Sequence, residues 1–195
     1  MKNFKFVIIG IACIILICVG FYFFSQKNVT TETELTEVEK LIVKNLEDNY
    51  PKTPREVVKF YNRIIACYYG GEITSADVEK LADQMLLLLD EDLLVVNSRE
   101  EYIDSVKSDI EKYKNENKRV VSTDVCDSNE VKYIDDEKEG TSEVEKLAYV
   151  NTSYFINTDG NFAYSYQQFV LRKDSKGRWK ILTFYEVEGE PSDND

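Results

Sequence analysis

"AYSYQQFVLRKDSKGRWKILTFYEV", residues 163–187, is the stretch that predicts the fold of this chain. Tyrosine, phenylalanine and β-branched residues are frequent on both sides of a short charged segment, and this composition is typical of β-strands. The charged segment "KDSKG", residues 173–177, has the composition of a type I turn, and Gly177 suits the left-handed position of a bulge. We therefore expect a hairpin of two strands, with Trp179 and Ile181 on the core side of the second strand.

Within this hairpin, residues 172–181 form a basic segment in an acidic chain. The 195 residues of the chain include 24 basic and 36 acidic residues, and the net charge is −12. The segment itself contains Arg172, Lys173, Lys176, Arg178 and Lys180. It is either a docking patch or a hairpin tip whose charges pair with acids of the same chain and protect the sheet edge. The excess of acidic residues favours the second interpretation, because intramolecular partners are plentiful.

Strand patterns occupy the C-terminal part of the chain, and helix patterns precede them. The strand patterns begin at residue 119, and "TDGN", residues 158–161, contains the Asp-Gly pair of a tight hairpin. "DEDLLVVN", residues 90–97, is interpreted as a connection. Capping signals predict helices at about 37–48, 54–69, 76–89 and 99–116. This order of elements predicts an α+β domain in which three to four helices pack on a strongly twisted antiparallel sheet.

The capped helix "TPREVVKFYNRIIACYYGG", residues 53–71, and the C-terminal hairpin with its Trp-x-Ile strand carry a resemblance to a known family. They resemble the nuclear-transport-factor-two-like superfamily, a cystatin-like cone, and within it uncharacterised membrane-anchored members from Gram-positive bacteria. The resemblance covers about residues 50–188 and implies a cone-shaped domain. It also implies that enzymes of this type, such as ketosteroid isomerase and scytalone dehydratase, work inside the cone, and that the exposed sheet face often mediates dimers.

The N-terminal residues 6–24 are apolar and uncharged, and their number is close to what spans a bilayer. Two lysines precede them and bulky aromatic residues end them, so we expect an uncleaved transmembrane signal anchor. The alternatives are a cleaved signal peptide and a lipoprotein modified at Cys13. The expected localisation is the cell membrane, crossed once, with the N-terminus in the cytoplasm and the C-terminal domain outside. The corresponding segments are a cytoplasmic tip at 1–5, a stalk with a short helix at 25–49, an extracytoplasmic domain at 50–188 and a disordered tail at 189–195.

Several kinds of site are disfavoured by composition. The chain has no histidine and no Cys-x-x-Cys motif, so the usual zinc sites are excluded, and we expect neither a metal nor a cofactor. The acidity of the chain disfavours nucleic acid as a partner. Cys67 and Cys126 lie outside the apolar segment, and they either form a disulfide or are buried free thiols.

Polar residues within the strands are the candidate site residues. Asp124, in "STDVCD", is the only strand carboxylate between apolar neighbours, and it is either a catalytic acid or base or a residue that faces solvent. Six more residues are candidates for the lining of a ligand cavity: Tyr149, Asn151, Ser153, Tyr164, Tyr166 and Gln168. The alternative is that these six lie on the solvent face of a half-exposed sheet.

The expected function is a non-catalytic extracytoplasmic domain that binds a small ligand or a partner protein, which is a second copy or another surface protein. The expectation is motivated by the lack of histidine and of a recognisable catalytic motif in the sequence. The alternative is a small-molecule isomerase or dehydratase that uses Asp124 or a strand tyrosine as its acid or base. That alternative predicts a deep apolar cavity between the helices and the sheet.

Overall fold

The computed structural model of the chain describes residues 34–96, 98–137 and 144–189. Its helices are α2 (Glu37–Ile42), α3 (Pro54–Tyr69), α4 (Ser75–Leu86), α5 (Glu91–Val96) and α6 (Arg99–Asn115). Its strands are β1 (Lys118–Val125), β2 (Lys132–Glu137), β3 (Val144–Thr158), β4 (Asn161–Lys173) and β5 (Trp179–Val187). The described residues therefore form an α+β structure in which the helices precede an antiparallel sheet.

The predicted fold needs correction. The sequence predicts a transmembrane helix followed by three to four helices, whereas the described residues contain five helices. None of these helices is long and apolar enough to cross a membrane, so the predicted fold is wrong for the described part of the chain. The segments predicted as a signal anchor, 6–24, and as a cytoplasmic tip, 1–5, lie outside the described residues, as do residues 190–195 of the predicted tail. The expected localisation depends on those segments and stays a prediction.

The predicted helix at 76–89 ends earlier, at Leu86. Two further differences, the end of the first helix and a helix that was not predicted, each have a side chain that binds nearby backbone. The first helix ends at Ile42, since the Asn45 carboxamide oxygen accepts hydrogen bonds from the amides of residues 47 and 48 and forms a turn. The predicted connection at 90–97 contains α5, because the Asp90 carboxylate accepts from the Asp92 amide and starts a helical turn. None of the six residues of α5 is buried, and Leu93 alone among them packs against the core, which explains why apolar periodicity did not reveal it.

The starts of the longer helices agree with the capping signals. Thr53 and Ser98 each accept a hydrogen bond from a backbone amide three residues on, and the glutamate at that position accepts one in return. At α4 the Thr74 side chain accepts a hydrogen bond from the Asp77 amide, without a return bond of the capping-box kind. Such caps satisfy amides that the first helical turn leaves unpaired. Local sequence therefore determines where these helices begin.

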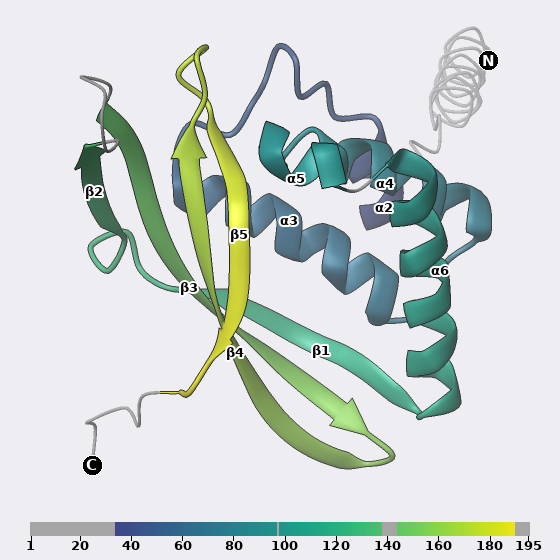
Figure 1. Cartoon of the computed structure of the whole chain (residues 1–195). Coiled ribbons are helices and arrows are strands. Elements are labelled where there is room, and N and C mark those ends of the chain that lie inside the picture. Colours follow the sequence, from purple (N-terminus) through teal and green to yellow (C-terminus); the bar gives the residue numbers. More distant parts are fainter. Residues whose placement is uncertain (1–33, 97, 138–143, 190–195) are drawn as a thin grey trace, which may run out of the picture. The chain divides into compact units, whose positions relative to one another are not determined.

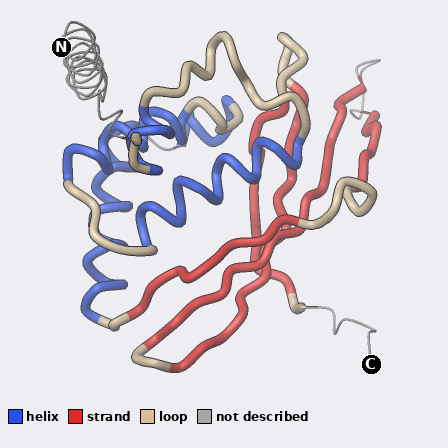
Figure 2. The backbone as a smooth tube through the Cα atoms, turned by 180° about the vertical axis from the view of Figure 1, so that it is seen from behind, coloured by secondary structure: helices blue, strands red, loops and turns tan. Residues whose placement is uncertain are grey.

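The sheet has the order β1, β3, β4, β5, and β2 pairs with β3 beside β1. Asp159 and Gly160 form the β3–β4 turn with φ of 51° and 86°, as the Asp-Gly pair predicts. The long hairpin of β3 and β4 twists strongly along its length, and helices cover only one face of the sheet (Figure 1). The view from behind shows α3 running across that face (Figure 2). One face of the sheet is therefore inside the domain, and the other is open.

The core lies between α3, α4 and the covered sheet face. Ile64 and Met85 from the helices and Val150 and Phe169 from the strands are fully buried. Trp179 and Ile181 are buried as well, which confirms the predicted core side of the last strand. This packing leaves α3 fixed against the sheet by apolar contacts along its whole length.

The basic hairpin tip pairs with acids of the same chain at two of its residues. Arg172 binds Asp90 and also Asp92, with a guanidinium-to-carboxylate distance of 2.8 Å for the latter pair. Arg178 binds Asp174 at 3.0 Å, and Gly177 has φ of 76°, in the left-handed region. The intramolecular interpretation is therefore confirmed for Arg172 and Arg178.

Candidate functional site

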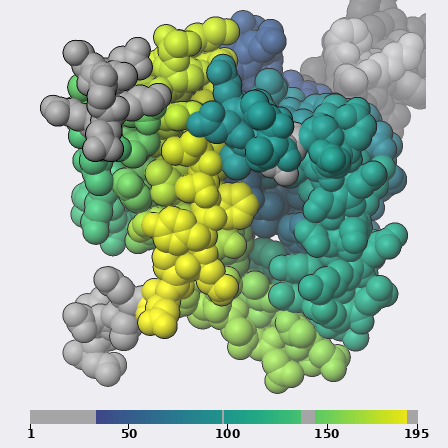
Figure 3. Space-filling model, viewed as in Figure 1, coloured from purple at the N-terminus to yellow at the C-terminus, as the bar shows by residue number. Residues whose placement is uncertain are grey.

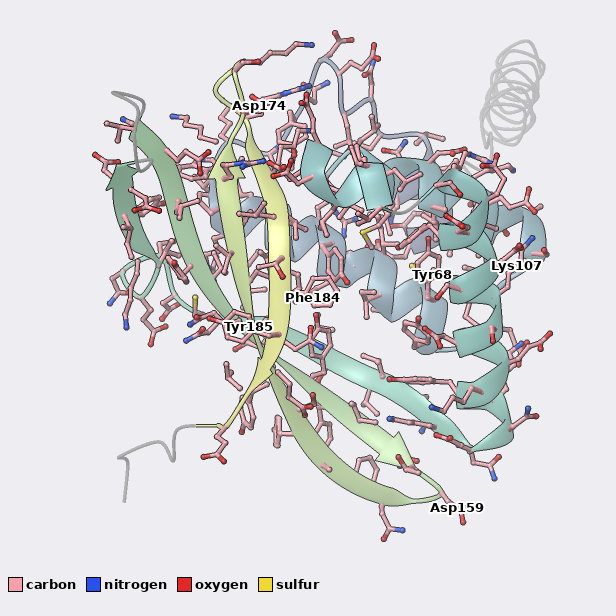
Figure 4. The ribbon with its side chains drawn as sticks, viewed as in Figure 1. Tyr68, Lys107, Asp159, Asp174, Phe184 and Tyr185 are labelled. Carbon is pink, nitrogen blue, oxygen red and sulfur yellow. The ribbon has the colours of Figure 1, made fainter. Side chains whose placement is uncertain are left out.

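A cavity of about 370 Å³ lies between α3, α6 and the covered sheet face. In the space-filling view a hollow separates β5 from α6, with atoms of α3 at its floor (Figure 3). Tyr68 of α3 and Phe184 of β5 lie on opposite sides of this space (Figure 4). The volume falls within the range of pockets that hold small organic molecules. The residues that line it are Tyr61, Ile65, Tyr68, Tyr69, Tyr102, Ser105, Val106, Asp109, Lys112, Tyr113, Val120, Tyr154, Ile156, Ser165, Gln167 and Phe184.

Tyrosines dominate the cavity wall because two helices present them at helical spacing. Tyr61, Tyr68 and Tyr69 come from α3, and Tyr102 and Tyr113 come from α6. The rings of Tyr69 and Tyr113 pack with their centroids 4.4 Å apart and join the two helices. Packing between rings of neighbouring elements positions these side chains without a polar core.

The tyrosine hydroxyls of the wall are neutral donors. Burial raises the pKa of Tyr61, Tyr68, Tyr69, Tyr102 and Tyr154 above the usual value of 10. The Tyr68 hydroxyl donates to the Val78 carbonyl at 3.5 Å. The tyrosine hydroxyls therefore stay protonated at neutral pH, and they offer hydrogen bonds rather than charge.

A buried polar network holds the strand side of the cavity. Tyr154 on β3 donates its hydroxyl to the carboxamide oxygen of Asn62 at 2.7 Å. The Asn62 amide nitrogen donates to the Thr152 hydroxyl at 2.7 Å, and this hydroxyl donates to the Asp124 carbonyl. Asn62 and Thr152 are almost fully buried. Because every member is paired, the network fixes the orientation of the Tyr154 ring in the wall.

The charged residues of the cavity are at its rim. Asp109 and Lys112 are exposed residues of α6, and they are the only ionisable residues other than tyrosine among the lining residues. The interior polar groups are the hydroxyl of Ser165 and the amide of Gln167, both on β4. The interior thus combines aromatic walls with a few uncharged hydrogen-bonding groups.

The six residues predicted to line a cavity lie on the other face of the sheet. None of them is among the lining residues of the cavity, whereas their strand neighbours Tyr154, Ser165 and Gln167 are. The register pairs Ser153 with Tyr166 and Asn151 with Gln168, so the structure brings the predicted residues together. Gln168 donates to Asn151 at 2.8 Å and accepts from Tyr185. Side chains alternate between the two faces along a strand, so the six predicted residues point away from this cavity and their strand neighbours point into it. The six residues concerned are Tyr149, Asn151, Ser153, Tyr164, Tyr166 and Gln168.

Asp124 does not belong to the cavity either. It is exposed on β1, paired in register with Ser153 on the open face. Its carbonyl takes part in the buried network, but its carboxylate is outside. The structure therefore supports the solvent-facing alternative for this residue.

Of the two alternatives for Cys67 and Cys126, the structure has the free thiols and no disulfide between them. Arg55 near the start of α3 binds the Cys126 carbonyl. Cys67 is twelve residues farther along the same helix, about 18 Å at 1.5 Å per residue. A disulfide requires the two Cα atoms within about 7 Å, and the helix therefore keeps the thiols apart.

Sequence reasoning missed the helical half of the site. Tyr61, Tyr68, Tyr102 and Tyr113 have the three- and four-residue spacing of a core face, and this spacing alone is typical of packing. The available signal was the concentration of hydroxyl-bearing rings on two helices, since a core built for packing alone favours residues without polar atoms.

Comparisons with known proteins identify the family but not a relative of known activity. No curated protein matches the chain at a significant level. A family model matches residues 1–184, nearly the whole chain. The helices, the sheet and the wall of the tyrosine cavity lie within this match, except for the end of β5. The chain therefore belongs to the family described as a domain of unknown function, DUF6715.

Proposed function

We propose that this domain binds a small, uncharged and largely apolar ligand in the tyrosine-lined cavity, without catalysis. The observation that carries the proposal is the cavity itself, about 370 Å³ of space beside a tightly packed core. Pockets that bind small molecules combine aromatic and apolar walls with a few polar groups, as this one does. A ligand that fills it removes the apolar surface of these rings from water.

The chemistry of the wall selects an uncharged ligand. Its tyrosines are neutral, and its interior groups Ser165 and Gln167 are uncharged. An ion in this interior would lose its hydration without gaining an opposite charge. A flat apolar ring with a hydroxyl group would pack against the aromatic walls and bind a polar group of the interior, such as the Gln167 amide.

The alternative function, an isomerase or dehydratase, requires a general base inside the cavity. Among the described lining residues, the carboxylate and the amine are at the exposed rim, and burial holds the tyrosines in their protonated form. A general acid or base works best with a pKa near the working pH. Binding without catalysis is therefore the function that we propose.

A ring introduced at Ser165 tests the proposal. Ser165 is half-buried on β4 and lines the cavity, and phenylalanine is well accepted in strands. We expect the full-length chain to bind 2-naphthol, measured by the fluorescence of the probe. We expect Ser165→Phe to weaken this binding about tenfold or more, because the added ring occupies the cavity, and tenfold corresponds to about 1.4 kcal/mol.

Ser153→Phe is the matched control. Ser153 is also half-buried in a central strand but lies on the open face, so this variant should bind 2-naphthol like the unmodified chain. Equal binding by the unmodified chain and Ser165→Phe, or no saturable binding by any of them, would refute the cavity as the binding site.

We further propose that a second copy of the chain is the protein partner and that it docks on the open sheet face. Phe162, Tyr164 and Tyr185 are exposed on β4 and β5, and Phe155 stacks beside Phe162 with ring centroids 5.2 Å apart. The residues of β3 from 149 to 157 and of β4 from 162 to 168 that point to this face carry no charge. Aromatic enrichment and charge depletion are typical of the centre of protein interfaces.

A charge placed at Tyr164 tests this partner. Tyr164 is 60% exposed, and Tyr133, on the other face of the sheet, is 59% exposed and serves as the control position. Chemical cross-linking of the full-length chain should give dimers that Tyr164→Glu abolishes and Tyr133→Glu preserves. Equal loss in both variants, or only monomer in the unmodified chain, would contradict the proposal.

A further inference from the structure

A second pocket, of about 480 Å³, lies between the loop that joins α2 to α3 and one face of α3. The view from behind shows this loop passing from the end of α2 to the start of α3 (Figure 2). The pocket shares no lining residue with the tyrosine cavity. We call it the basic groove, because four of its nine lining residues are basic and one is acidic. The basic residues are Lys44, Lys52, Lys59 and Arg63, and the acidic residue is Glu56.

This concentration of positive charge is opposite to the charge of the chain, which is −12. Lys44, Lys52 and Lys59 have no carboxylate within ion-pair distance among the described residues, whereas Arg63, the fourth cation of the groove, pairs with Glu37. Lys59 and Arg63 are four residues apart on α3 and therefore lie on the same side of the helix. Like charges brought together repel each other, and the three lysines of the groove have no ion-pair partner in the described part of the chain that would relieve this repulsion.

The aromatic ring of Phe60 holds two of the cations in place. The Lys44 ammonium lies 4.7 Å from the centroid of the Phe60 ring, and the Arg63 guanidinium lies 5.9 Å from the same centroid. Arg63 is also bound by Glu37 at 2.6 Å, which fixes its orientation and neutralises one charge. Cations held by ring faces lose less conformational freedom when an anion binds.

The acidic residue of the groove is already engaged. One carboxylate oxygen of Glu56 accepts from the backbone amides of Lys52 and Thr53 at 2.8 and 3.1 Å, and these bonds cap α3. This carboxylate is therefore committed to the start of the helix. The lysine ammonium groups remain available to a ligand.

Two cations of the basic hairpin tip lie beside Tyr50, one wall of the groove, and Asp174 balances the charge of one of them, Arg178. Arg178 and Lys180 lie 5.3 and 4.7 Å from the centroid of the Tyr50 ring. Burial, followed by the charge of Arg178, lowers the pKa of Lys180. The basic segment at 172–181 and the groove are thus neighbours in space, although more than a hundred residues separate them in sequence.

We propose that the basic groove binds a small organic phosphate, with its phosphate groups among the four cations and its apolar part against Tyr50. Lysine and arginine are the usual phosphate-binding side chains, and arginine can bind two phosphate oxygens at once. The volume suits a small molecule. A long polyanion is disfavoured, because beyond the groove it would meet the acidic surface of the domain.

Titration calorimetry of the full-length chain with inorganic pyrophosphate tests the proposal. We expect saturable binding that weakens as salt is added, since the contacts are ionic. Lys59→Gln should weaken binding about tenfold, because it removes one charge-assisted contact. Lys59 is exposed on the surface of α3, so the substitution leaves the core intact, and circular dichroism verifies the fold.

Lys132→Gln is the matched control, because Lys132 is an exposed lysine of β2 outside the groove and the variant has the same net charge. Its affinity for pyrophosphate should equal that of the unmodified chain. Equal weakening in both variants would show a general charge effect and overturn the proposal, and so would an absence of binding. Binding to vesicles of phosphatidylglycerol that depends on Lys59, without binding of pyrophosphate, would assign the groove to a lipid surface instead.

Discussion

Replacing Asn62 by alanine tests whether the buried network holds the cavity wall. Asn62 is 1% exposed and makes two hydrogen bonds of 2.7 Å, one from Tyr154 and one to Thr152. Two buried hydrogen bonds contribute about 2 kcal/mol net, and the Tyr154 hydroxyl left without its acceptor costs about 1 kcal/mol more. We therefore expect Asn62→Ala to lower the free energy of unfolding by about 3 kcal/mol.

Urea denaturation followed by tryptophan fluorescence measures this loss. The chain contains a single tryptophan, Trp179, which is 8% exposed in the folded state and reports on the sheet. Tyr154→Phe removes one bond of the network, so we expect it to cost about half as much as Asn62→Ala. The double variant should lose about 1 kcal/mol less than the sum of the single losses, because the two residues share a bond.

The same variants connect stability with binding. Because Asn62 orients the Tyr154 ring, Asn62→Ala should also weaken the binding of 2-naphthol. A loss of stability below about 0.5 kcal/mol for Asn62→Ala would refute the reasoning, since an intact network of buried bonds is worth more. Additive losses in the double variant would show that the two side chains are not coupled.

Three further predictions concern the hairpin tip and a helix cap. Arg172→Met should lower the free energy of unfolding by about 3 kcal/mol in urea denaturation, because it removes the cation that binds the buried carboxylate of Asp90; an unchanged midpoint would contradict this. Bonds from the side chain and backbone of Ser98 lower the pKa of Glu101, so its contribution is present above the usual 4.5 and is lost as pH falls; Glu101→Gln should flatten the acid side of the melting-temperature profile. Gly177→Ala should cost about 1 kcal/mol, since φ there is 76°; an unchanged melting temperature would show that the turn relaxes.

Elements with a local cause were predictable. The turn at residues 173–177 depends on Gly177, and the starts of α3 and α6 depend on caps within four residues. The end of α2 also has a local cause, the Asn45 side chain, but helix periodicity continued past it and concealed the turn. The identity of an element therefore follows from its own residues more reliably than its length does.

The short helix α5 shows where local patterns fail. Its leucines and valines predict burial, yet Val95 is 85% exposed. The helix is held by backbone bonds to Asp90, and that residue is fixed in turn by Arg172, more than eighty positions away. A pattern within the segment contains no information about that ion pair.

The sequence by itself determined the strands, the tight turns, the starts of the capped helices and the set of uncharged polar residues on alternate strand positions. Only the tertiary structure decided which face of the sheet became the cavity wall. Alternation divides a strand into two faces but does not say which of them α3 and α6 cover. That choice depends on contacts between residues far apart in the chain, such as Tyr61 with Phe184 and Asn62 with Tyr154. These contacts placed Tyr154 and Ser165 inside and Tyr164 and Tyr166 outside, because packing decides the inside of a sheet.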